Sequence, residues 1–398
     1  MKILLVALNS KYIHSNLALR YIKSYCSNHS SMELMEFSIN DRIERMVGQI
    51  FLAKPDLVAF SCYIWNIKEV LMVSDTIKRV IKHCKIVLGG PEVSFDAADI
   101  IRNNPGVDFI VMGEGERTFR QLLDALKNDG DLSRVRGLAY RQEDKIIVNP
   151  PQPLIADLDT IPFPYEDGFS GLENKIIYYE TSRGCPFNCQ YCLSSTFSGV
   201  RFFSLERVKK ELEIFIKAGI SQVKLVDRTF NCNPERAKEI FRTILELGGN
   251  TNFHFEMAGH LIDREMLDIL KQAPPGLFQF EIGVQSTNPA TLDDIKRKTD
   301  FNALAQAVTQ IRANENIHIH LDLIAGLPKE DYESFKRSFN DVYFLKPNRL
   351  QLGFLKLLKG SGLRIRAAEY GYEYTQYPPY QVLQSHHISY EELLKLEA

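Results

Sequence analysis

Several classes of protein are excluded by what this sequence lacks. It has no apolar run near the roughly 20 residues that a membrane-spanning helix needs, and its first residues, MKILLVALNSKYIHS, turn polar without the small-residue site at which a signal peptide is cleaved. It has no charge excess, because 48 basic side chains are matched by 50 acidic ones, so nothing favours nucleic acid or an anionic membrane as a partner. It has no internal repeat and no low-complexity tract. We therefore expect a globular, cytoplasmic protein with neither a membrane nor a nucleic-acid partner.

A fourth cysteine is missing where three others cluster. The chain has seven cysteines, an odd number that fits a reducing compartment. Three of them, Cys185, Cys189 and Cys192, lie close together in RGCPFNCQYCLSS (183–195). A structural zinc ion and an electron-transfer iron–sulfur cluster normally take four protein ligands, so three thiolates on a four-iron cluster would leave one iron open to a substrate or cofactor. The alternatives are a zinc site completed by a distant histidine, or three unrelated thiols.

Short apolar runs alternate with amphipathic stretches along residues 1–149. This alternation predicts an α/β domain with a doubly wound, Rossmann-like parallel sheet. GLAYR and KIIVNP (137–149) predict a hairpin at its end. The predicted strands are 2–8, 56–63, 85–90 and 108–116, and the predicted helices are 15–27, 66–83, 92–103 and 117–128.

A proline-rich stretch then separates this domain from a second alternating series. Five prolines between positions 150 and 164 predict a stiff linker over 150–172. Residues 173–365 predict a partial (βα)6 barrel, whose chemistry would gather at the carboxyl ends of its strands. We expect residues 366–398, a carboxyl-terminal extension, either to dock on this barrel or to be the start of a truncated domain. The predicted barrel strands are 175–182, 222–227, 252–257, 278–285, 317–326 and 349–357, and the predicted helices are 204–218, 234–248, 263–272, 301–314 and 331–345.

The segment CPFNCQYC, with Tyr191 just before its last cysteine and a parallel βα series after it, resembles the radical S-adenosylmethionine (SAM) enzymes. The resemblance covers roughly residues 173–365. It implies that Cys185, Cys189 and Cys192 hold a [4Fe-4S] cluster whose fourth iron binds the amino and carboxylate groups of SAM. It further implies that an external reductant, such as flavodoxin or ferredoxin, reduces the cluster, and that SAM is then cleaved to methionine and a 5′-deoxyadenosyl radical.

The same resemblance implies a set of contacts to SAM at the ends of later strands. Asp227, in VDRTFN (226–231), stands where the family contacts the methionine amine, although the usual glycine–glycine–glutamate form is absent. For each polar residue the alternative is an ordinary helix cap or ion pair at the barrel rim. Cys232, nearby, is a hydrogen donor, an extra ligand or inert packing. The implied ribose and carboxylate contacts are Glu256 in FHFEMAG and Glu281, Gln285 and Arg297 in EIGVQSTNPATLDDIKR, and the implied adenine contact is Ile324 in LIAGLP.

Three segments of the first domain, SCYIWN (61–66), VLGGPEVS (87–94) and VDFIVMGEGERTFRQLL (107–123), closely resemble a cobalamin-binding domain. Such domains carry D-x-H-x-x-G after the first strand, but this chain has YIHSNL (12–17), so His14 is kept while the aspartate and glycine are replaced. His14 is then either a cobalt ligand or a cap of the next helix, and the lower axial ligand stays open. Trp65 is expected in the core or, alternatively, in the wall of the corrinoid pocket. The implied cobalamin contacts are His14, Ser61, Gly89, Gly90, Gly113, Glu114 and Gly115.

Together these resemblances imply a cobalamin-dependent radical SAM enzyme. Its expected reaction is methylation of an unactivated centre in a small molecule or peptide, and a minority of the family instead catalyses oxidative cyclisation or rearrangement. One alternative is a methylthiotransferase acting on tRNA or protein, which would need a second cluster on Cys26, Cys62 and Cys84. The other alternative is a corrinoid-binding module without catalytic activity.

Overall fold

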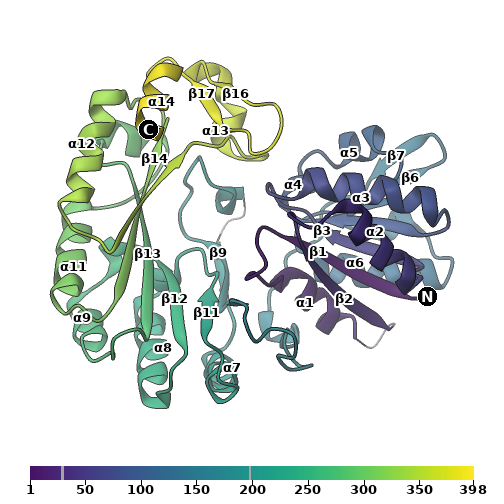
Figure 1. The fold of residues 1–398 in the computed structure, drawn as a ribbon, viewed down its shortest axis with the longest axis horizontal. Coiled ribbons are helices and arrows are strands. Elements are labelled where there is room, and N and C mark those ends of the chain that lie inside the picture. Colours follow the sequence, from purple (N-terminus) through teal and green to yellow (C-terminus); the bar gives the residue numbers. More distant parts are fainter. Residues whose placement is uncertain (28–30, 197–198) are drawn as a thin grey trace. The chain divides into compact units, whose positions relative to one another are not determined.

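The computed structural model describes residues 1–27, 31–196 and 199–398. Within them the chain forms two compact units, Met1–Lys175 and Ile176–Ala398 (Figure 1). In these ranges no helix has both the length and the apolar character needed to cross a membrane.

The first unit is built on a seven-stranded sheet in the order β2-β1-β3-β4-β5-β6-β7. The first five strands are parallel and the last two add an antiparallel hairpin, which confirms the predicted doubly wound sheet. Strand order reverses between β1 and β3, and this reversal is where sheets of this kind bind ligands. The strands are β1 (Ile3–Asn9), β2 (Met32–Ser38), β3 (Leu57–Ser61), β4 (Lys85–Gly89), β5 (Phe109–Val111), β6 (Leu138–Gln142) and β7 (Lys145–Val148).

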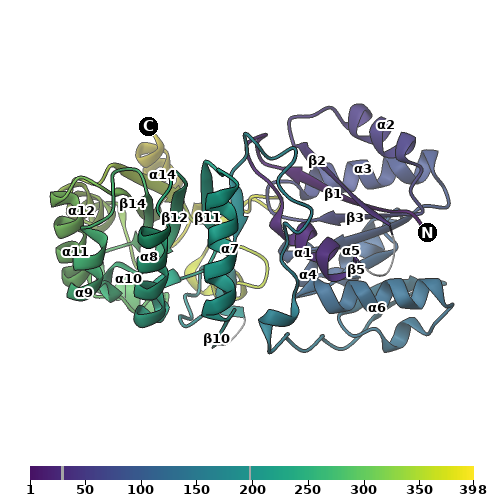
Figure 2. The same ribbon diagram turned by 90° about the horizontal axis from the view of Figure 1, so that it is seen from below.

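Helices cover both faces of this sheet (Figure 2). On one face, α2 (Ile43–Ala53), α3 (Ile67–Val80) and α5 (Ala97–Asn103) pack their buried aliphatic side chains on the strands. On the other face, α1 (Leu17–Tyr25) and α6 (Gly115–Lys127) do the same. Because both faces are covered, the central strand β1 is buried along its whole length, as is typical of parallel sheets.

Two elements of this unit, β2 and α2, were not among the predicted ones. Strand β2 is an edge strand in which only Met32 and Phe37 are buried, and Glu33 and Glu36 interrupt its apolar residues, so it does not have the apolar run of a central strand. Glu36 instead accepts a hydrogen bond from Lys175 at 2.9 Å.

The proline-rich residues 150–172 belong to this unit, and their second half contacts α1. Their only described regular element is a single turn of 3-10 helix, Leu158–Thr160. Asp167 pairs with Lys23 at 2.7 Å, and the Arg20 guanidinium stands over the Tyr165 ring at 5.5 Å.

The second unit is an open sheet of six parallel strands in the order β15-β14-β13-β12-β11-β8, with helices along its outer side (Figure 1). This arrangement confirms the predicted partial barrel. The strands are β8 (Ile177–Tyr179), β11 (Gln222–Leu225), β12 (Asn252–Met257), β13 (Phe278–Gln285), β14 (His318–Ala325) and β15 (Arg349–Phe354), and the outer helices are α7 (Leu205–Lys217), α8 (Pro234–Leu247), α9 (Arg264–Leu270), α11 (Phe301–Ala313) and α12 (Tyr332–Tyr343).

The two faces of this barrel sheet differ in chemistry. On the outer face, Phe241 of α8 packs against Phe255 and Phe278, with ring centroids 5.1 and 5.2 Å apart. The opposite face alternates with this one along β13 and β14 and is polar, which is unusual for a parallel sheet covered on both sides. In register across the strands it presents Tyr178, Lys224, His254 and Gln279 in one row, and Glu256, Glu281, His320 and Arg349 in the next.

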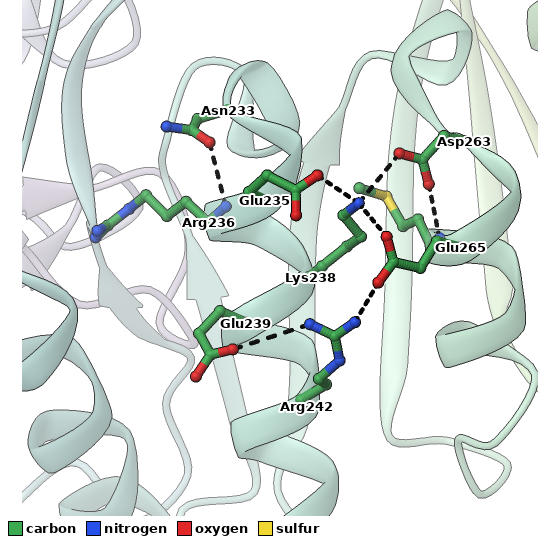
Figure 3. Close-up of polar contacts among 9 residues, drawn as sticks. Asn233, Glu235, Arg236, Lys238, Glu239, Arg242, Asp263 and Glu265 are labelled. Atoms are coloured by element: carbon green, nitrogen blue, oxygen red, sulfur yellow. Dashed lines mark hydrogen bonds and ion pairs between the residues drawn. The ribbon is translucent and has the colours of Figure 1, made fainter.

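An ion network on the outer side joins α8 to α9 (Figure 3). The Lys238 side chain is 3% exposed, and its ammonium lies 2.6 Å from Glu235, 3.4 Å from Asp263 and 2.5 Å from Glu265. Arg242 reaches Glu265 from the next turn of α8. The buried cation is therefore fully paired, and the network fixes the second helix of the barrel to the third.

Shorter elements complete the second unit. A hairpin of β9 (Ser182–Cys185) and β10 (Gly199–Phe202) follows β8, and α10 (Pro289–Asp294) follows β13. The remaining elements are η3 (Leu193–Thr196), η4 (Phe230–Cys232), η5 (Gly259–Leu261), α13 (Gly362–Ile365), η6 (Ala367–Tyr370), β16 (Glu373–Tyr374), β17 (Val382–Gln384) and α14 (Tyr390–Glu397).

Candidate active site

The three clustered cysteines lie on one loop, residues 185–192, which we call the cysteine loop. It leaves the end of β9 at Cys185, just after the first barrel strand, where the sequence predicts it. The Cys192 N–H donates to the Cys189 carbonyl at 3.0 Å, which closes a turn between these two residues. Cys185 and Cys189 are buried and Cys192 is partly exposed.

Arg297 lies beside this loop. Its guanidinium donates to the Cys189 Sγ at 3.9 Å, to the Tyr191 hydroxyl at 2.8 Å and to the Gly283 carbonyl at the end of β13. Burial raises the pKa of the Cys189 thiol, and the positive charge of Arg297 acts in the opposite direction. Arg297 thus ties the cysteine loop to β13 and places a positive charge next to a thiol, which favours a thiolate ligand.

The structure also shows whether the described side chains form a ready-made site for a single metal ion. In the part of the chain that the structure describes, no three His, Cys, Asp or Glu side chains stand close enough to share one metal ion.

Asp227 holds the two residues that begin the strand leading to the cysteine loop. Its carboxylate is buried and accepts hydrogen bonds from the Thr181 N–H at 2.9 Å, the Thr181 hydroxyl at 2.7 Å and the Ser182 hydroxyl at 2.5 Å. Burial raises the pKa of this carboxyl, and the hydrogen bonds oppose that effect. Both oxygens are therefore occupied in holding residues 181–182, at the start of the strand that ends at Cys185. The predicted contact of Asp227 with the SAM amine stays a prediction.

The carboxylates Glu256 and Glu281 lie side by side on the polar face of the barrel. Glu281 lies 3.2 Å from the His254 imidazole and 2.8 Å from the Lys224 ammonium, and these contacts lower its pKa to about 2. Glu256 is 3.8 Å from the same ammonium, and burial raises its pKa. One cation is therefore shared by two carboxylates, and Glu256 is the less firmly held of the two.

Polar atoms without partners gather at the ends of β13 and β14. Gln285 follows a bulge in β13 and has a φ of +74°, a conformation that is strained for any residue but glycine. Its Oε1, Arg297 Nε and Asp322 Oδ1 are buried and bond to no described residue. Burial, followed by the charges of Glu281 and Glu256, raises the pKa of Asp322 to about 7. Because such buried atoms need partners, this region fits a polar ligand.

Ile324 lies two residues beyond Asp322 on the same face of β14, opposite Gly353 of β15. Asp322, Lys224 and His254 were not among the predicted site residues. Their alternation with apolar neighbours was the available signal, but a half-exposed strand has the same pattern.

The predicted cobalamin contacts lie along the carboxyl edge of the first sheet. Ser61 ends β3 opposite Gly89 of β4, and Gly89 stands opposite Val111 of β5. Gly90 has a φ of +113°, and a Cβ added there would lie 2.5 Å from the Cys62 carbonyl oxygen. Only glycine therefore allows the loops after β3 and β4 to approach this closely.

The GEG segment continues this edge beyond β5. Gly113 has a φ of +74° and Gly115 begins α6, with Glu114 as its N-cap residue. The Ser94 hydroxyl links the neighbouring turns, because it donates to the Gly90 carbonyl at 2.8 Å and accepts from the Gly113 N–H at 3.3 Å. Ser94 was not predicted as a site residue.

Two asparagines hold the point where strand order reverses, and sequence analysis missed both. Asn66 donates to the carbonyls of Leu8 at 3.0 Å and Ser61 at 2.9 Å, so it bridges the ends of β1 and β3. Asn16 donates to the Ser61 hydroxyl at 2.9 Å and accepts from the Leu19 N–H. Asn16, rather than His14, therefore caps α1. His14 lies in the loop before that cap, and its carbonyl accepts from Asn9 at 2.9 Å.

Large aromatic side chains are exposed on loops that follow these strands. Tyr12 is 71% exposed after β1, Trp65 is 44% exposed after β3, and Phe95 is 45% exposed after β4. Trp65 stacks on Tyr63 with ring centroids 4.4 Å apart. The prediction that Trp65 lies in the core is therefore wrong.

Comparison with known proteins matches both halves of this arrangement. The family model of the B12 binding domain matches residues 3–123, that of the Radical SAM superfamily matches residues 179–342, and that of a protein of unknown function (DUF4080) matches residues 368–398. A solved structure, that of the radical S-adenosylmethionine methyltransferase TsrM from Kitasatospora setae with cobalamin and a [4Fe-4S] cluster bound, superposes with a TM-score of 0.81 at 18% identity, over 96% of this chain and 82% of that one.

Two curated relatives match in sequence. The uncharacterized methyltransferase PH0819 of Pyrococcus horikoshii is 28% identical over 330 residues, which are 80% of this chain and 70% of the relative. The cobalamin-dependent radical SAM methyltransferase TokK of Streptomyces tokunonensis is 32% identical over 302 residues, 72% of this chain; the match spans only 44% of TokK. With a B12 binding domain followed by a radical SAM domain, the chain belongs to the cobalamin-binding radical SAM family.

Proposed function

We propose that this protein is a cobalamin-dependent radical SAM methyltransferase that methylates an unactivated centre of a small molecule or peptide. The observation that carries the proposal is the loop of three cysteines at the carboxyl end of a parallel barrel, with the Arg297 guanidinium against one of the thiols. The relatives named as methyltransferases support the choice of methyl transfer over cyclisation.

In this proposal Cys185, Cys189 and Cys192 hold the cluster. The bound cofactors supply the chemistry, since a reduced [4Fe-4S] cluster cleaves SAM to give a 5′-deoxyadenosyl radical and cobalamin carries the methyl group. Arg297 stabilises the thiolate form of Cys189 through its charge, and Tyr191 is oriented by its hydrogen bond to the same guanidinium. The electron comes from an external one-electron reductant such as flavodoxin or ferredoxin.

SAM would bind at the ends of β12, β13 and β14. The buried atoms without partners, Gln285 Oε1 and Arg297 Nε, are an acceptor and a donor that suit its polar groups. Glu256 is the carboxylate with room to accept from the ribose, because Glu281 is already held by Lys224 and His254. Ile324 offers an apolar side chain and strand backbone for the adenine.

Cobalamin would bind at the carboxyl edge of the first sheet. Glycines at 89, 90, 113 and 115 keep this edge free of side chains, so a bulky ligand can approach the backbone of β4 and β5. Ser61 and Glu114 add polar groups, and the exposed aromatics Tyr12 and Trp65 add apolar surface. His14, in the loop before α1, would be the imidazole through which the protein could coordinate the cobalt.

The positions of the other cysteines argue against the methylthiotransferase alternative. Cys26 is the C-cap residue of α1, Cys62 follows the carboxyl end of β3 and Cys84 precedes the amino end of β4. Burial raises the pKa of Cys26 to about 12 and that of Cys84 to about 11, so both stay as thiols. Residues at opposite ends of a sheet cannot share one cluster.

The test is anaerobic purification, iron–sulfur reconstitution and addition of hydroxocobalamin, followed by optical spectra and mass spectrometry for 5′-deoxyadenosine. Retained corrinoid, with 5′-deoxyadenosine formation that is lost in Cys189→Ala and kept in the control Cys84→Ala, is the expected result. SAM with a deuterated methyl group then reports methyl transfer to candidate substrates. A cluster that cleaves SAM without retained corrinoid would overturn the cobalamin assignment, and corrinoid without SAM cleavage would favour the non-catalytic module.

A further inference from the structure

The segment that follows the barrel, residues 366–398, packs on the carboxyl ends of its last two strands; we call it the C-terminal cap. The Val382 N–H donates to the Leu355 carbonyl at 2.9 Å, and the Leu357 N–H donates to the Tyr380 carbonyl at 3.0 Å. Residues 380–382 therefore pair antiparallel with the chain that leaves β15, as the bridge between Lys356 and Gln381 also shows. In this way the cap forms a short antiparallel pair with the chain just beyond the end of β15.

The cap also contacts the turn at the end of β14. The Tyr372 hydroxyl donates to the Gly326 carbonyl at 2.9 Å, and both groups are buried. The side chains of Val382 and Leu393 approach the position where a Gly326 Cβ would lie, at 3.8 and 3.9 Å. Gly326 is two residues beyond Ile324, so the cap supports the strand end to which the proposed function assigns the adenine.

A second set of contacts leads to the cysteine loop. Gln190, between Cys189 and Tyr191, donates through its N–H to the Ile295 carbonyl at 2.9 Å, and its own carbonyl accepts from the Leu363 N–H at 2.9 Å. Its side chain packs directly against Gly362. The backbone of the loop is thus held from both sides at a single residue, and one of the two supports is α13.

The cap in turn holds α13. The Arg364 guanidinium stands over the Tyr380 ring at 4.5 Å and the Tyr374 ring at 5.5 Å, and it donates to the Leu357 carbonyl at 2.8 Å. Both rings belong to the cap. A continuous series of contacts therefore runs from the cap through Arg364 and α13 to Gln190 in the cysteine loop.

We propose that the C-terminal cap is a positioning element of the active site, which sets the cysteine loop through Arg364 and the end of β14 through Tyr372. This proposal rests on the proposed function, which assigns the cluster to the cysteine loop and the SAM adenine to the end of β14. A cap that only adds stability would need neither the hydrogen bond to Gly326 nor a connection to Gln190. It would suffice for it to pair with residues 355–357, which follow β15.

The test compares two variants of the full chain with a matched control. Tyr372→Phe removes only the hydroxyl that bonds Gly326, and Arg364→Lys keeps the charge but loses the planar stacking on Tyr380. Tyr377→Phe is the control, because Tyr377 lies in the same cap and is 69% exposed. Hydrogen–deuterium exchange is measured peptide by peptide on the chain without cofactors, and SAM affinity and the electron paramagnetic resonance spectrum of the reduced cluster are measured after reconstitution.

Each variant is expected to loosen a different segment outside the cap. Tyr372→Phe should speed exchange in the peptide containing Gly326 and weaken SAM binding, both by roughly two- to tenfold, the equivalent of one hydrogen bond. Arg364→Lys should speed exchange in the peptide containing Gln190 by roughly two- to fivefold and change the spectral response of the cluster to SAM. Tyr377→Phe should match the wild type.

Two outcomes separate this proposal from the proposed function. Faster exchange confined to residues 366–398 in both variants, with wild-type SAM affinity and spectra, would overturn the positioning role. If the wild-type chain assembles no cluster, the proposed function fails, while exchange in the two distant peptides still decides whether the cap holds them.

Discussion

The clearest test of the first sheet is the substitution Gly90→Ala. The added Cβ would lie 2.5 Å from the Cys62 carbonyl oxygen, whereas ordinary carbon–oxygen contacts begin at about 3.3 Å, so the loops after β3 and β4 must separate by roughly 0.8 Å. That shift would stretch the 2.7 Å hydrogen bond from the Cys62 N–H to Gly89 beyond bonding range, at a cost of about 1 kcal/mol. A φ of +113° adds about 1–3 kcal/mol for a residue with a side chain. We expect a total loss of about 2–4 kcal/mol.

The assay is urea unfolding followed by tryptophan fluorescence, because the chain has one tryptophan and Trp65 lies three residues after Cys62. With a slope of roughly 2 kcal/mol per molar urea, the midpoint should fall by about 1–2 M. Gly113→Ala is the matched control, since Gly113 also has a positive φ but open space where its Cβ would lie, and its cost should be about 1 kcal/mol. Equal midpoints for the two variants would refute the steric argument.

Three further predictions concern polar groups inside the two units. Lys238→Met should lower the thermal midpoint clearly more than Lys210→Met does. Lys238 is buried among three carboxylates, whereas Lys210 is exposed beside one. Equal shifts in the two variants would contradict this prediction. Asp322→Asn should raise the midpoint relative to the wild type by an amount that grows from pH 5 to about pH 7 and then levels off. Burial raises the pKa of Asp322 to about 7, so over this range the folded state keeps a proton that the unfolded chain releases, and stability falls as the pH rises; a difference independent of pH would count against it. Asn66→Asp should lower the urea midpoint reported by Trp65 more than Asn104→Asp does. The Asn66 amide donates to two carbonyls, whereas the Asn104 amide donates to one. An unchanged midpoint would show that Asn66 does not join β1 to β3.

The fold could be predicted from sequence where strands are buried on both sides. Strand β1 is an unbroken apolar run because helices cover both of its faces, and such runs are visible without a structure. Strand β2 has one neighbour, and Glu33 and Glu36 interrupt its apolar residues, so its pattern did not distinguish it from a loop. Edge strands are specified by their partner more than by their own residues.

The candidate site divides in the same way. The cysteines were found because their ligand spacing is local in sequence, and the glycines because turns at strand ends depend on them. Asn66 and Lys224 were missed, because each acts on groups brought together by the fold: two carbonyls that end different strands, and two carboxylates on different strands. No local sequence pattern distinguishes such residues from polar residues that are exposed on the surface.

Alternate residues of a barrel strand have different roles: those on the outer face pack the core, and those on the polar face are available to contact a ligand. Along β13, Phe278 and Phe280 point to the outer core while Gln279 and Glu281 point to the polar face. Successive positions of one strand are therefore under separate constraints, and a change at every second residue leaves the packing of the others intact. Such a barrel can evolve, or be engineered by libraries restricted to the polar face, toward new substrates at little risk to its core.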